Sequence, residues 1–345
     1  MTDKPAPLRL GGWRGLGLFW GCVLACLGGL AGVLQILGPP AETRAPLRVA
    51  AVPPPPVVAE RTTPPRPGRN TPGPVAAPDP ALLERLPGEP PRFLPRVGAD
   101  GRAPMAVYAA GFAPGTQGPR VGLVLAGVGL DHAGSEAAAK ALPAGVTLAV
   151  SPYATDLDPV LAVIRAAGHE YLLSIPMEPP GFALNNPGDQ ALMTSLPPEE
   201  NARRLDWVLS RVTGYVGVTG ALGRLRGERF AADGDLMAPL LRAVAGRGLL
   251  YIDPRPDAAS VPEAWSRRVD LVVDDGETAS SVDAQLAELA RIARERGSAL
   301  GLAGAVRPVT VERVAAWASQ LAAQGIALAP VSALVEAPRK PEAPR

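Results

Sequence analysis

Cysteine and histidine are scarce in this sequence, which contains two of each in 345 residues. Cys22 and Cys26 both lie in an apolar segment near the amino terminus, so the rest of the chain holds neither a disulfide framework nor a cysteine-based zinc site. The histidines are His132 and His169. A metal centre built from several histidines is therefore excluded unless carboxylates supply most of its ligands.

A charge imbalance is missing as well. The formal net charge is +1, with 34 basic and 33 acidic residues, so a nucleic-acid partner is not expected. Neither a G-x-G-x-x-G fingerprint nor a Walker-type loop occurs in the sequence, and a nucleotide site has no support. We expect no cofactor, with a divalent metal only if a metal site has been rebuilt from other residues.

The segment from Gly15 to Leu37 carries no charge and a single polar side chain, Gln35. About 20 apolar residues span a bilayer as a helix, and this run exceeds the apolar region of a signal peptide. We therefore expect residues 15–37 to be an uncleaved transmembrane anchor; a cleaved signal peptide is the alternative. Basic residues before the span predict a cytoplasmic stretch at 1–14, a single pass through the inner membrane and a periplasmic domain; these are Lys4, Arg9 and Arg14.

Small residues recur at every fourth position of this segment, and they are Gly17, Gly21, Ala25 and Gly29. Such a stripe packs two membrane helices into a homodimer, although glycine is also simply frequent in membrane spans. Residues 38–92 are rich in proline and alanine, a composition that predicts an extended, disordered linker. Within it, residues 80–86 can form a helical turn or two. Residues 337–345 are expected to be a disordered tail.

From residue 93 to residue 336 apolar runs alternate with amphipathic stretches. The expected strands are Val121–Leu125, Val146–Val150, Tyr171–Ile175, Tyr215–Val218, Leu249–Ile252, Leu271–Val273, Ala299–Leu302 and Ile326–Ala329, with Ala106–Ala109 as a further candidate. The expected helices are Ser135–Leu142, Asp156–Ala167, Pro198–Val212, Gly234–Arg247, Val282–Arg296 and Val309–Gln324.

This alternation predicts an α/β fold with parallel strands and right-handed crossovers. About seven or eight strand–helix units favour a (β/α)7–8 barrel-like fold over an open doubly wound sheet, which stays the alternative. Ligand sites of such barrels lie where the strands end at their carboxyl termini.

Four motifs in this order and spacing resemble the divergent polysaccharide deacetylase family, which is related to NodB-type deacetylases with a (β/α)7 barrel-like fold. They are Leu172-Leu173-Ser174-Ile175-Pro176-Met177-Glu178-Pro179, Gly214-Tyr215-Val216-Gly217-Val218, Tyr251-Ile252-Asp253-Pro254-Arg255 and Pro330-Val331-Ser332-Ala333-Leu334. The resemblance covers Arg120 to Leu334. It implies carbohydrate metabolism and a cell-envelope polysaccharide or other glycan as the partner.

The chain departs from the family pattern where related metal-dependent deacetylases hold a divalent ion with one Asp and two His and use another Asp as base. An Asp-Asp pair corresponds to Ala126-Gly127, and a His corresponds to Ser174. An Asn-Asn-His-Met-Gly motif reads Thr219-Gly220-Ala221-Leu222-Gly223, and a Gly-His-Pro reads Ala303-Gly304-Ala305. Since a hydrolytic metal needs about three protein ligands, these departures favour a pseudoenzyme without the usual metal site, while the family itself is deacetylase-like; whether the chain is an enzyme stays open.

Polar residues that follow the expected strands are the remaining site candidates. Catalysis has three weak candidates, namely Asp131, His132 and Asp253. Substrate binding is assigned to Ser174, Glu178, Asp253, Arg255 and Asp274.

Each of these candidates also has a structural interpretation. Asp253 and Arg255 form an ion pair that holds their loop or bind a sugar hydroxyl. Asp274 and Asp275 are adjacent, so their side chains point to opposite faces and a turn role is favoured. For His132 and Glu178 the interpretation as exposed loop residues is favoured over a functional one. His169 is expected to cap the end of the 156–167 helix on the opposite side.

Aromatic rings that can stack on sugars are Tyr153, Trp207, Tyr215, Trp265 and Trp317, although the helical Trp207 and Trp317 are more typical of a core. Three functions stay open. The first is envelope-facing glycan binding without metal-dependent hydrolysis. The second is an active deacetylase or hydrolase whose site is rebuilt from Asp131, His132, Asp253 and Asp274, and the third is a structural docking module of the envelope.

Overall fold

The computed structural model describes residues 71–113, 117–182, 184–259, 263–276 and 278–338. The predicted membrane anchor, its stripe of small residues, residues 38–70 of the linker and the tail from residue 339 lie outside this part. Among the described residues, no helix is both long and apolar enough to cross a membrane.

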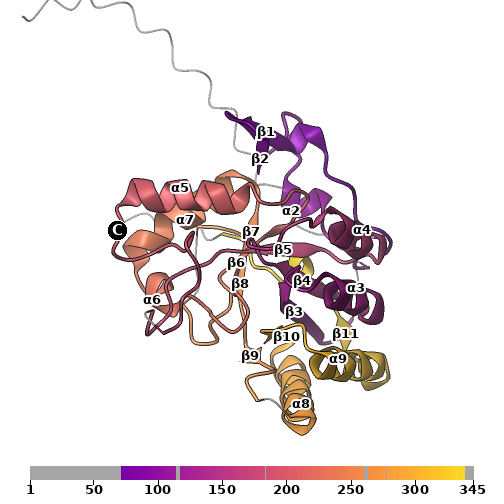
Figure 1. The fold of residues 1–345 in the computed structure, drawn as a ribbon. Coiled ribbons are helices and arrows are strands. Elements are labelled where there is room, and N and C mark those ends of the chain that lie inside the picture. The colour runs from indigo at the N-terminus through magenta and orange to yellow at the C-terminus, as the bar shows by residue number, and fades with distance from the viewer. Residues whose placement is uncertain (1–70, 114–116, 183, 260–262, 277, 339–345) are drawn as a thin grey trace, which may run out of the picture. The chain divides into compact units, whose positions relative to one another are not determined.

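A nine-stranded parallel sheet is the centre of the fold (Figure 1). Its path runs β8-β7-β6-β5-β4-β3-β10-β9, and β11 also pairs with β3. The strands are β3 (Arg120–Val128), β4 (Val146–Val150), β5 (Tyr171–Ser174), β6 (Gly217–Thr219), β7 (Leu250–Asp253), β8 (Ser266–Arg268), β9 (Leu271–Val272), β10 (Ser298–Ala303) and β11 (Ala327–Leu328). No ladder between described residues joins β8 to β9, so the sheet is a curled half-barrel rather than a closed barrel.

Helices surround this sheet, as Figure 1 shows. They are α2 (Pro104–Val107), α3 (His132–Ala141), α4 (Asp158–Ala166), α5 (Pro198–Leu209), α6 (Glu228–Ala231), α7 (Gly234–Gly246), α8 (Ala279–Arg296) and α9 (Pro308–Leu321), with 3-10 turns η1 (Pro80–Leu82), η2 (Ala322–Gln324) and η3 (Val331–Ala333). Proline at the first turn of α4, α5 and α9 suits helix starts, because the N–H donor that proline lacks would have no partner within the helix there.

Successive residues of each strand enter two different cores, because side chains alternate between the faces of a sheet. Leu123, Leu148 and Leu173 pack on the outer face against the helices. Val124 and Leu172 pack on the concave face, which the lead-in segment around Tyr108 and the η3 turn cover from inside. Both faces of the parallel sheet are therefore buried, which explains why its strands read as continuous apolar runs.

The expected strands and helices of the sheet are present, with boundary shifts of a few residues. The elements that were predicted wrongly or not predicted are short or polar. Residues 104–107 form a helical turn, α2, so the candidate strand at Ala106–Ala109 was wrong. Proline at its first position and the missing neighbour strand favour the turn. The strand β8 and the short helix α6 were not predicted.

The boundary of the linker at residue 92 was also wrong, because ordered elements precede it. Asp79 caps η1, and β1 (Leu83–Leu86) pairs antiparallel with β2 (Arg92–Pro95). Leu82 and Leu94 are fully buried against the domain. Burial of these apolar side chains stabilises a segment whose proline content alone favours extended structure.

Candidate functional site

The carboxyl ends of the parallel strands meet at one edge of the sheet, which we call the carboxyl edge. The sheet order places the ends of β3, β4, β5 and β6 next to one another there. All seven candidate residues from the sequence lie at the ends of strands, in the turns that follow or, for His132, at the start of α3. None of the seven is among the residues that line the cavity described below.

Asp253 and Arg255 form an ion pair after β7. Both carboxylate oxygens of Asp253, which is 2% exposed, accept from the Arg255 side chain, at 2.9 Å from Nε and 2.7 Å from Nη2. The Arg255 backbone N–H also donates to Asp253 Oδ1. These hydrogen bonds raise the pKa of the Arg255 guanidinium. The pair closes the turn after β7, as the structural alternative predicted.

Asp274 connects two loops at the carboxyl edge. Its Oδ1 accepts from the Gly304 N–H at 2.7 Å, and its Oδ2 lies 3.4 Å from Nη2 of Arg307. The adjacent Asp275 is exposed and pairs with Arg226. The two carboxylates therefore have separate partners, in accordance with a turn role.

Glu178 is buried, so it is not a solvated loop acid. Its Oε2 accepts from the Thr194 N–H at 2.6 Å and from Thr194 Oγ1 at 2.7 Å, while Oε1 lies 3.1 Å from Nε of Arg229. Its backbone carbonyl accepts from the N–H groups of Arg229 and Phe230. Glu178 joins the loop after β5 to α6.

The two histidines lie far apart in the fold and have different surroundings. Asp131 precedes α3 and is exposed, and His132 Nε2 lies 2.8 Å from the Thr155 carbonyl oxygen. His169 is fully buried, with its ring nitrogens 2.7 Å from the Val146 carbonyl oxygen and 3.0 Å from that of Ala139. The His169 ring does not cap the 156–167 helix, because the carbonyls it contacts belong to β4 and α3. The backbone N–H of His169 does donate to the Ile164 carbonyl at the end of that helix, at 3.1 Å.

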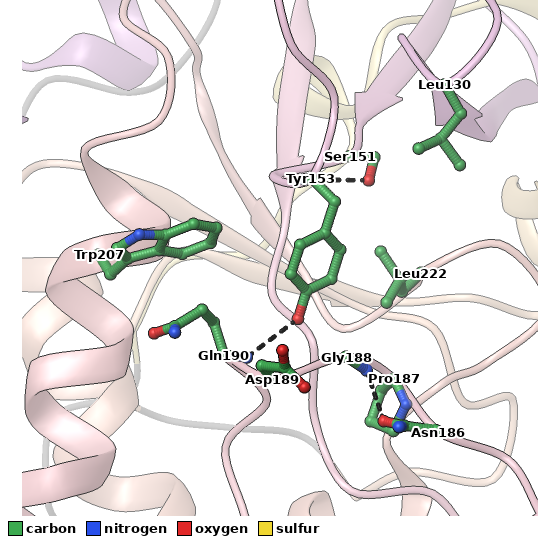
Figure 2. Close-up of a pocket in the computed structure, with 10 residues that line it drawn as sticks. All are labelled: Leu130, Ser151, Tyr153, Asn186, Pro187, Gly188, Asp189, Gln190, Trp207 and Leu222. Carbon is green, nitrogen blue, oxygen red and sulfur yellow. Dashed lines mark hydrogen bonds between the residues drawn. The ribbon is translucent and has the colours of Figure 1, made fainter.

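A cavity of about 520 Å³ opens at the carboxyl edge (Figure 2). Its walls come from the turns after β3, β4 and β6, from the loop after β5 and from α5. The lining residues are Leu130, Ser151, Tyr153, Asn186, Pro187, Gly188, Asp189, Gln190, Trp207 and Leu222. The volume of this cavity and its mixed apolar and polar lining are typical of a small-molecule site.

Two aromatic rings form one wall of this cavity. The ring centroids of Tyr153 and Trp207 are 5.9 Å apart with an interplanar angle of 41°. The loop approaches Tyr153 so closely that a Cβ atom on Gly188 would lie 2.5 Å from the phenol oxygen. Burial raises the pKa of the Tyr153 phenol, which therefore stays protonated. Its oxygen accepts from the Gln190 N–H at 3.3 Å.

The Arg211 side chain contacts both aromatic residues of this wall or the backbone beside them. Its guanidinium carbon lies 5.0 Å from the centroid of the Trp207 ring. Its Nε donates to the Pro152 carbonyl at 2.9 Å, and its Nη2 donates to that of Ala154 at 3.5 Å. The Arg211 side chain thus contacts the Trp207 ring and the backbone on both sides of Tyr153.

Sequence comparison assigns the family. The sequence profile of the divergent polysaccharide deacetylases matches residues 123–335, which is more than half of the chain. The chain belongs to this family. No curated protein sequence matches it.

Solved structures are similar to the chain as well. An uncharacterised protein from Agrobacterium tumefaciens C58 is 34% identical with a TM-score of 0.66, over 71% of this chain and all of that one. A putative cellobiose-phosphate cleavage protein from Enterococcus faecalis V583 is 11% identical, with a TM-score of 0.43 over 63% of this chain and all of its own. A family 4 carbohydrate esterase from Streptomyces lividans, solved with acetate, is 14% identical, with a TM-score of 0.39 over 64% of this chain and 98% of its own.

The positions that the sequence analysis compared with the metal ligands of related deacetylases include Ala126, Gly127, Ser174 and Gly304, which offer one hydroxyl among them. The loops after β6 and β10 approach each other there through glycine backbone: a Cβ atom on Gly304 would lie 3.0 Å from the Gly223 carbonyl oxygen. One on Gly127 would lie 3.7 Å from the Gly304 carbonyl oxygen. The part of the chain that the structure describes contains no group of three or more His, Cys, Asp or Glu side chains placed to hold a metal ion.

The loop residues 186–190 line the cavity but were not predicted as site residues, and Trp207 was predicted to be more typical of a core. A loop without a charged cluster carries no chemical signature, and the helical spacing of Trp207 is typical of a core position. Only the aromatic character of Tyr153 and Trp207, on neighbouring βα units, pointed to this wall.

Proposed function

We propose that this divergent polysaccharide deacetylase binds a glycan in the cavity at the carboxyl edge and does so without metal-dependent hydrolysis. The observation that carries the proposal is the wall of Tyr153 and Trp207 beside a 520 Å³ cavity. Aromatic rings offer flat apolar surface, and the Tyr153 phenol adds a hydrogen-bond donor. A sugar ring has complementary faces, with apolar C–H groups and peripheral hydroxyls.

The pseudoenzyme part of the proposal is supported by what the candidate catalytic residues do. Asp253 and Asp274 are engaged by Arg255 and Arg307, and a carboxylate held in this way is poorly placed to act as a base. The positions that correspond to the metal ligands of related deacetylases carry Ala126, Gly127 and Ser174. Their side chains supply at most one hydroxyl.

The proposal also includes the location of the domain in the cell. A single-pass anchor at residues 15–37, in the inner membrane, would hold the domain in the periplasm, where cell-envelope glycans occur. The support is the apolar, uncharged sequence of that segment and the basic residues before it.

Binding of oligosaccharides to the full-length protein tests the proposal. Trp207→Ala and Tyr153→Ala are each expected to lower the affinity for a glycan about tenfold in calorimetric titrations, because each removes a stacking surface. Trp317→Ala is the matched control, since Trp317 is a half-buried helical tryptophan that lines a different groove. Equal affinity in all three variants would exclude the aromatic wall as the binding site.

Metal content tests the absence of hydrolysis. After loading with zinc, cobalt or nickel, mass spectrometry of the protein is expected to show no stoichiometric metal. Zinc at unit stoichiometry that is lost in Asp253→Ala would contradict the proposal. Acetate release from acetylated oligosaccharides that His132→Ala abolishes would establish a rebuilt hydrolytic site, and a crosslinked protein partner without glycan binding would indicate a docking module.

A further inference from the structure

Three hydroxyl side chains lie side by side on neighbouring strands at the carboxyl edge. Ser174 ends β5 and pairs in the ladder with Thr219 of β6. Ser151 directly follows Val150 of β4, which pairs with Leu173 of β5. Residues at the same ladder level point to the same face. Ser151, Ser174 and Thr219 therefore form a row on the concave face, which we call the hydroxyl row.

The hydrogen-bonding capacity of this row is largely unused. Ser174 is 0% exposed, and its Oγ has no hydrogen-bond partner. Ser151 Oγ accepts from the Tyr153 N–H at 3.3 Å, and Thr219 Oγ1 accepts from the Ala221 N–H at 3.2 Å. Neither hydroxyl donates to another described residue. The row thus offers O–H donors that lack acceptors, which is costly for buried groups.

One member of the row, Ser151, lines the cavity directly after β4, while Ser174 and Thr219 are buried at 0% and 1% exposure and are not among its lining residues. Leu222, in the loop that follows Thr219, lines the cavity after β6. In the sheet β5 lies between β4 and β6. The buried hydroxyl of Ser174 is therefore located between two segments that line the cavity.

The opposite end of the same concave face shows what such hydroxyls bind in this protein. Thr147, also on β4, donates to the carboxylate of Glu170 at 3.1 Å, and Ser332 Oγ donates to it at 2.6 Å. The backbone N–H groups of Ser332 and Ala110 complete the shell at 3.0 and 2.9 Å. Within the described residues no cationic side chain pairs with this carboxylate. At the amino end of the face the chain itself supplies the acceptor, and at the carboxyl end it supplies none.

We propose that the hydroxyl row of Ser151, Ser174 and Thr219 binds the carboxylate of an acidic ligand, and that this ligand is a uronate-type saccharide bound in the cavity. The saccharide part of this inference rests on the proposed function. The carboxylate part stands on the unused donors alone. A carboxylate accepts several hydrogen bonds at once, whereas an ammonium group brings only further donors.

Acetate is the smallest probe of the row, and acetamide is its neutral counterpart. Titration of the full-length protein with carbon-13-labelled acetate, followed by NMR, is expected to show binding that Ser174→Ala and Ser151→Ala each weaken about tenfold. Acetamide is expected to bind more weakly than acetate. Thr310→Val is the matched control, because Thr310 is also fully buried with an unpartnered hydroxyl but lies on α9. Its acetate affinity should equal that of the wild type.

The outcomes separate this inference from the proposed function. No acetate binding, equal binding in the Ser151 and Ser174 variants, or acetamide binding as tightly as acetate would each overturn the hydroxyl row as a carboxylate site. Intact acetate binding together with a failure of both glucose and glucuronate oligosaccharides to bind would instead count against the proposed glycan function. Glucuronate oligosaccharides that bind more tightly than glucose ones, with the difference lost in Ser174→Ala, would support both.

Discussion

Glu170 and Ser332 are separated by 162 positions in the sequence, and Ser332 Oγ donates to the Glu170 carboxylate at 2.6 Å. Glu170 is fully buried just before β5, and Ser332 lies in η3 near the end of the domain. The same carboxylate accepts from Thr147 of β4 and from Ala110 of the lead-in segment. One side chain thus connects both ends of the domain with the sheet.

Stability should depend on pH through Glu170. Desolvation raises the pKa of its carboxyl above 4.5, although the four hydrogen bonds oppose this shift. A carboxyl whose pKa is raised in the folded state stabilises the fold fully below its unfolded value, and this contribution is lost as the pH rises through the folded value. The free energy of unfolding of the wild type, measured with urea, should therefore fall relative to that of Glu170→Gln as the pH rises above 4.5. Parallel pH profiles for the two proteins would show that Glu170 does not titrate in this way.

Removal of the Ser332 hydroxyl should destabilise the domain. Ser332→Ala deletes a donor to a buried carboxylate, and we expect a loss of about 2 kcal/mol in the free energy of unfolding. Ser319→Ala is the control, because its hydroxyl donates to the Ala316 carbonyl on the exposed side of α9. That change should cost less than about 0.5 kcal/mol. A similar small effect for Ser332→Ala would contradict a stabilising role of this bond.

Asp253→Asn should destabilise the turn after β7. Asp253 is buried while Arg255 is partly exposed, so the loss is expected to be about 2 kcal/mol, below that of a fully buried pair. Asp283→Asn breaks a chemically similar but exposed pair with Arg313, and its effect should be near zero. Urea unfolding of both variants measures the difference. If Asp253→Asn leaves stability unchanged, a ligand-binding role for this carboxylate becomes the better interpretation.

Sequence patterns predicted the sheet because its strands are buried on both faces. Val146–Val150 is a strand with the predicted bounds, since all five side chains are buried and all but Thr147 are apolar. The strand β8 has the sequence Ser-Arg-Arg at the edge of the sheet, where β7 is its one partner among the described strands and Ser266 adds a single bridge to Glu336. The segment before residue 92 was assigned to a linker because its order depends on contacts of Leu82 and Leu94 with residues distant in sequence.

The candidate site was predicted only in part, for a similar reason. The adjacency of Asp253 and Arg255 is local, and their ion pair could be predicted from the motif. Glu170 combines partners from three distant segments, so its charge alone gave no indication of burial. Trp207 lines the cavity together with residues 186–190 of the loop after β5, and helical spacing does not report the course of that loop.

Arg211 should control the geometry of the aromatic wall. Arg211→Ala removes the contact with the Trp207 ring and both hydrogen bonds to the backbone around Tyr153. We expect a change in the near-ultraviolet circular dichroism of the aromatic side chains, only partly restored by Arg211→Lys, since lysine lacks the planar fork of donors. Arg203→Ala is the control, because Arg203 lies on α5, the helix that carries Trp207, and its side chain pairs with Glu200. A spectrum of Arg211→Ala identical to the wild type would show that the wall keeps its geometry without this side chain.

Gly304→Ala should be destabilising because of the glycine contacts between the loops after β6 and β10. The added Cβ would lie 3.0 Å from the Gly223 carbonyl oxygen and 3.4 Å from Arg224 Cα, so backbone must move. We expect a loss of about 1–3 kcal/mol. Gly246→Ala, at the end of α7 with nothing within 4 Å of the new Cβ, is the control and should be neutral or stabilising by about 0.5 kcal/mol.

The same contact determines the result of replacing this glycine with a potential metal ligand. Gly304→Asp places a carboxylate near the position where related deacetylases carry a ligand, but it has to displace the backbone of the Gly223 loop. It should therefore unfold at a lower urea concentration than the wild type and bind no stoichiometric zinc. Zinc binding by a stable Gly304→Asp variant would mean that the two loops separate easily, and the glycine contacts would then not account for the difference from metal-dependent relatives.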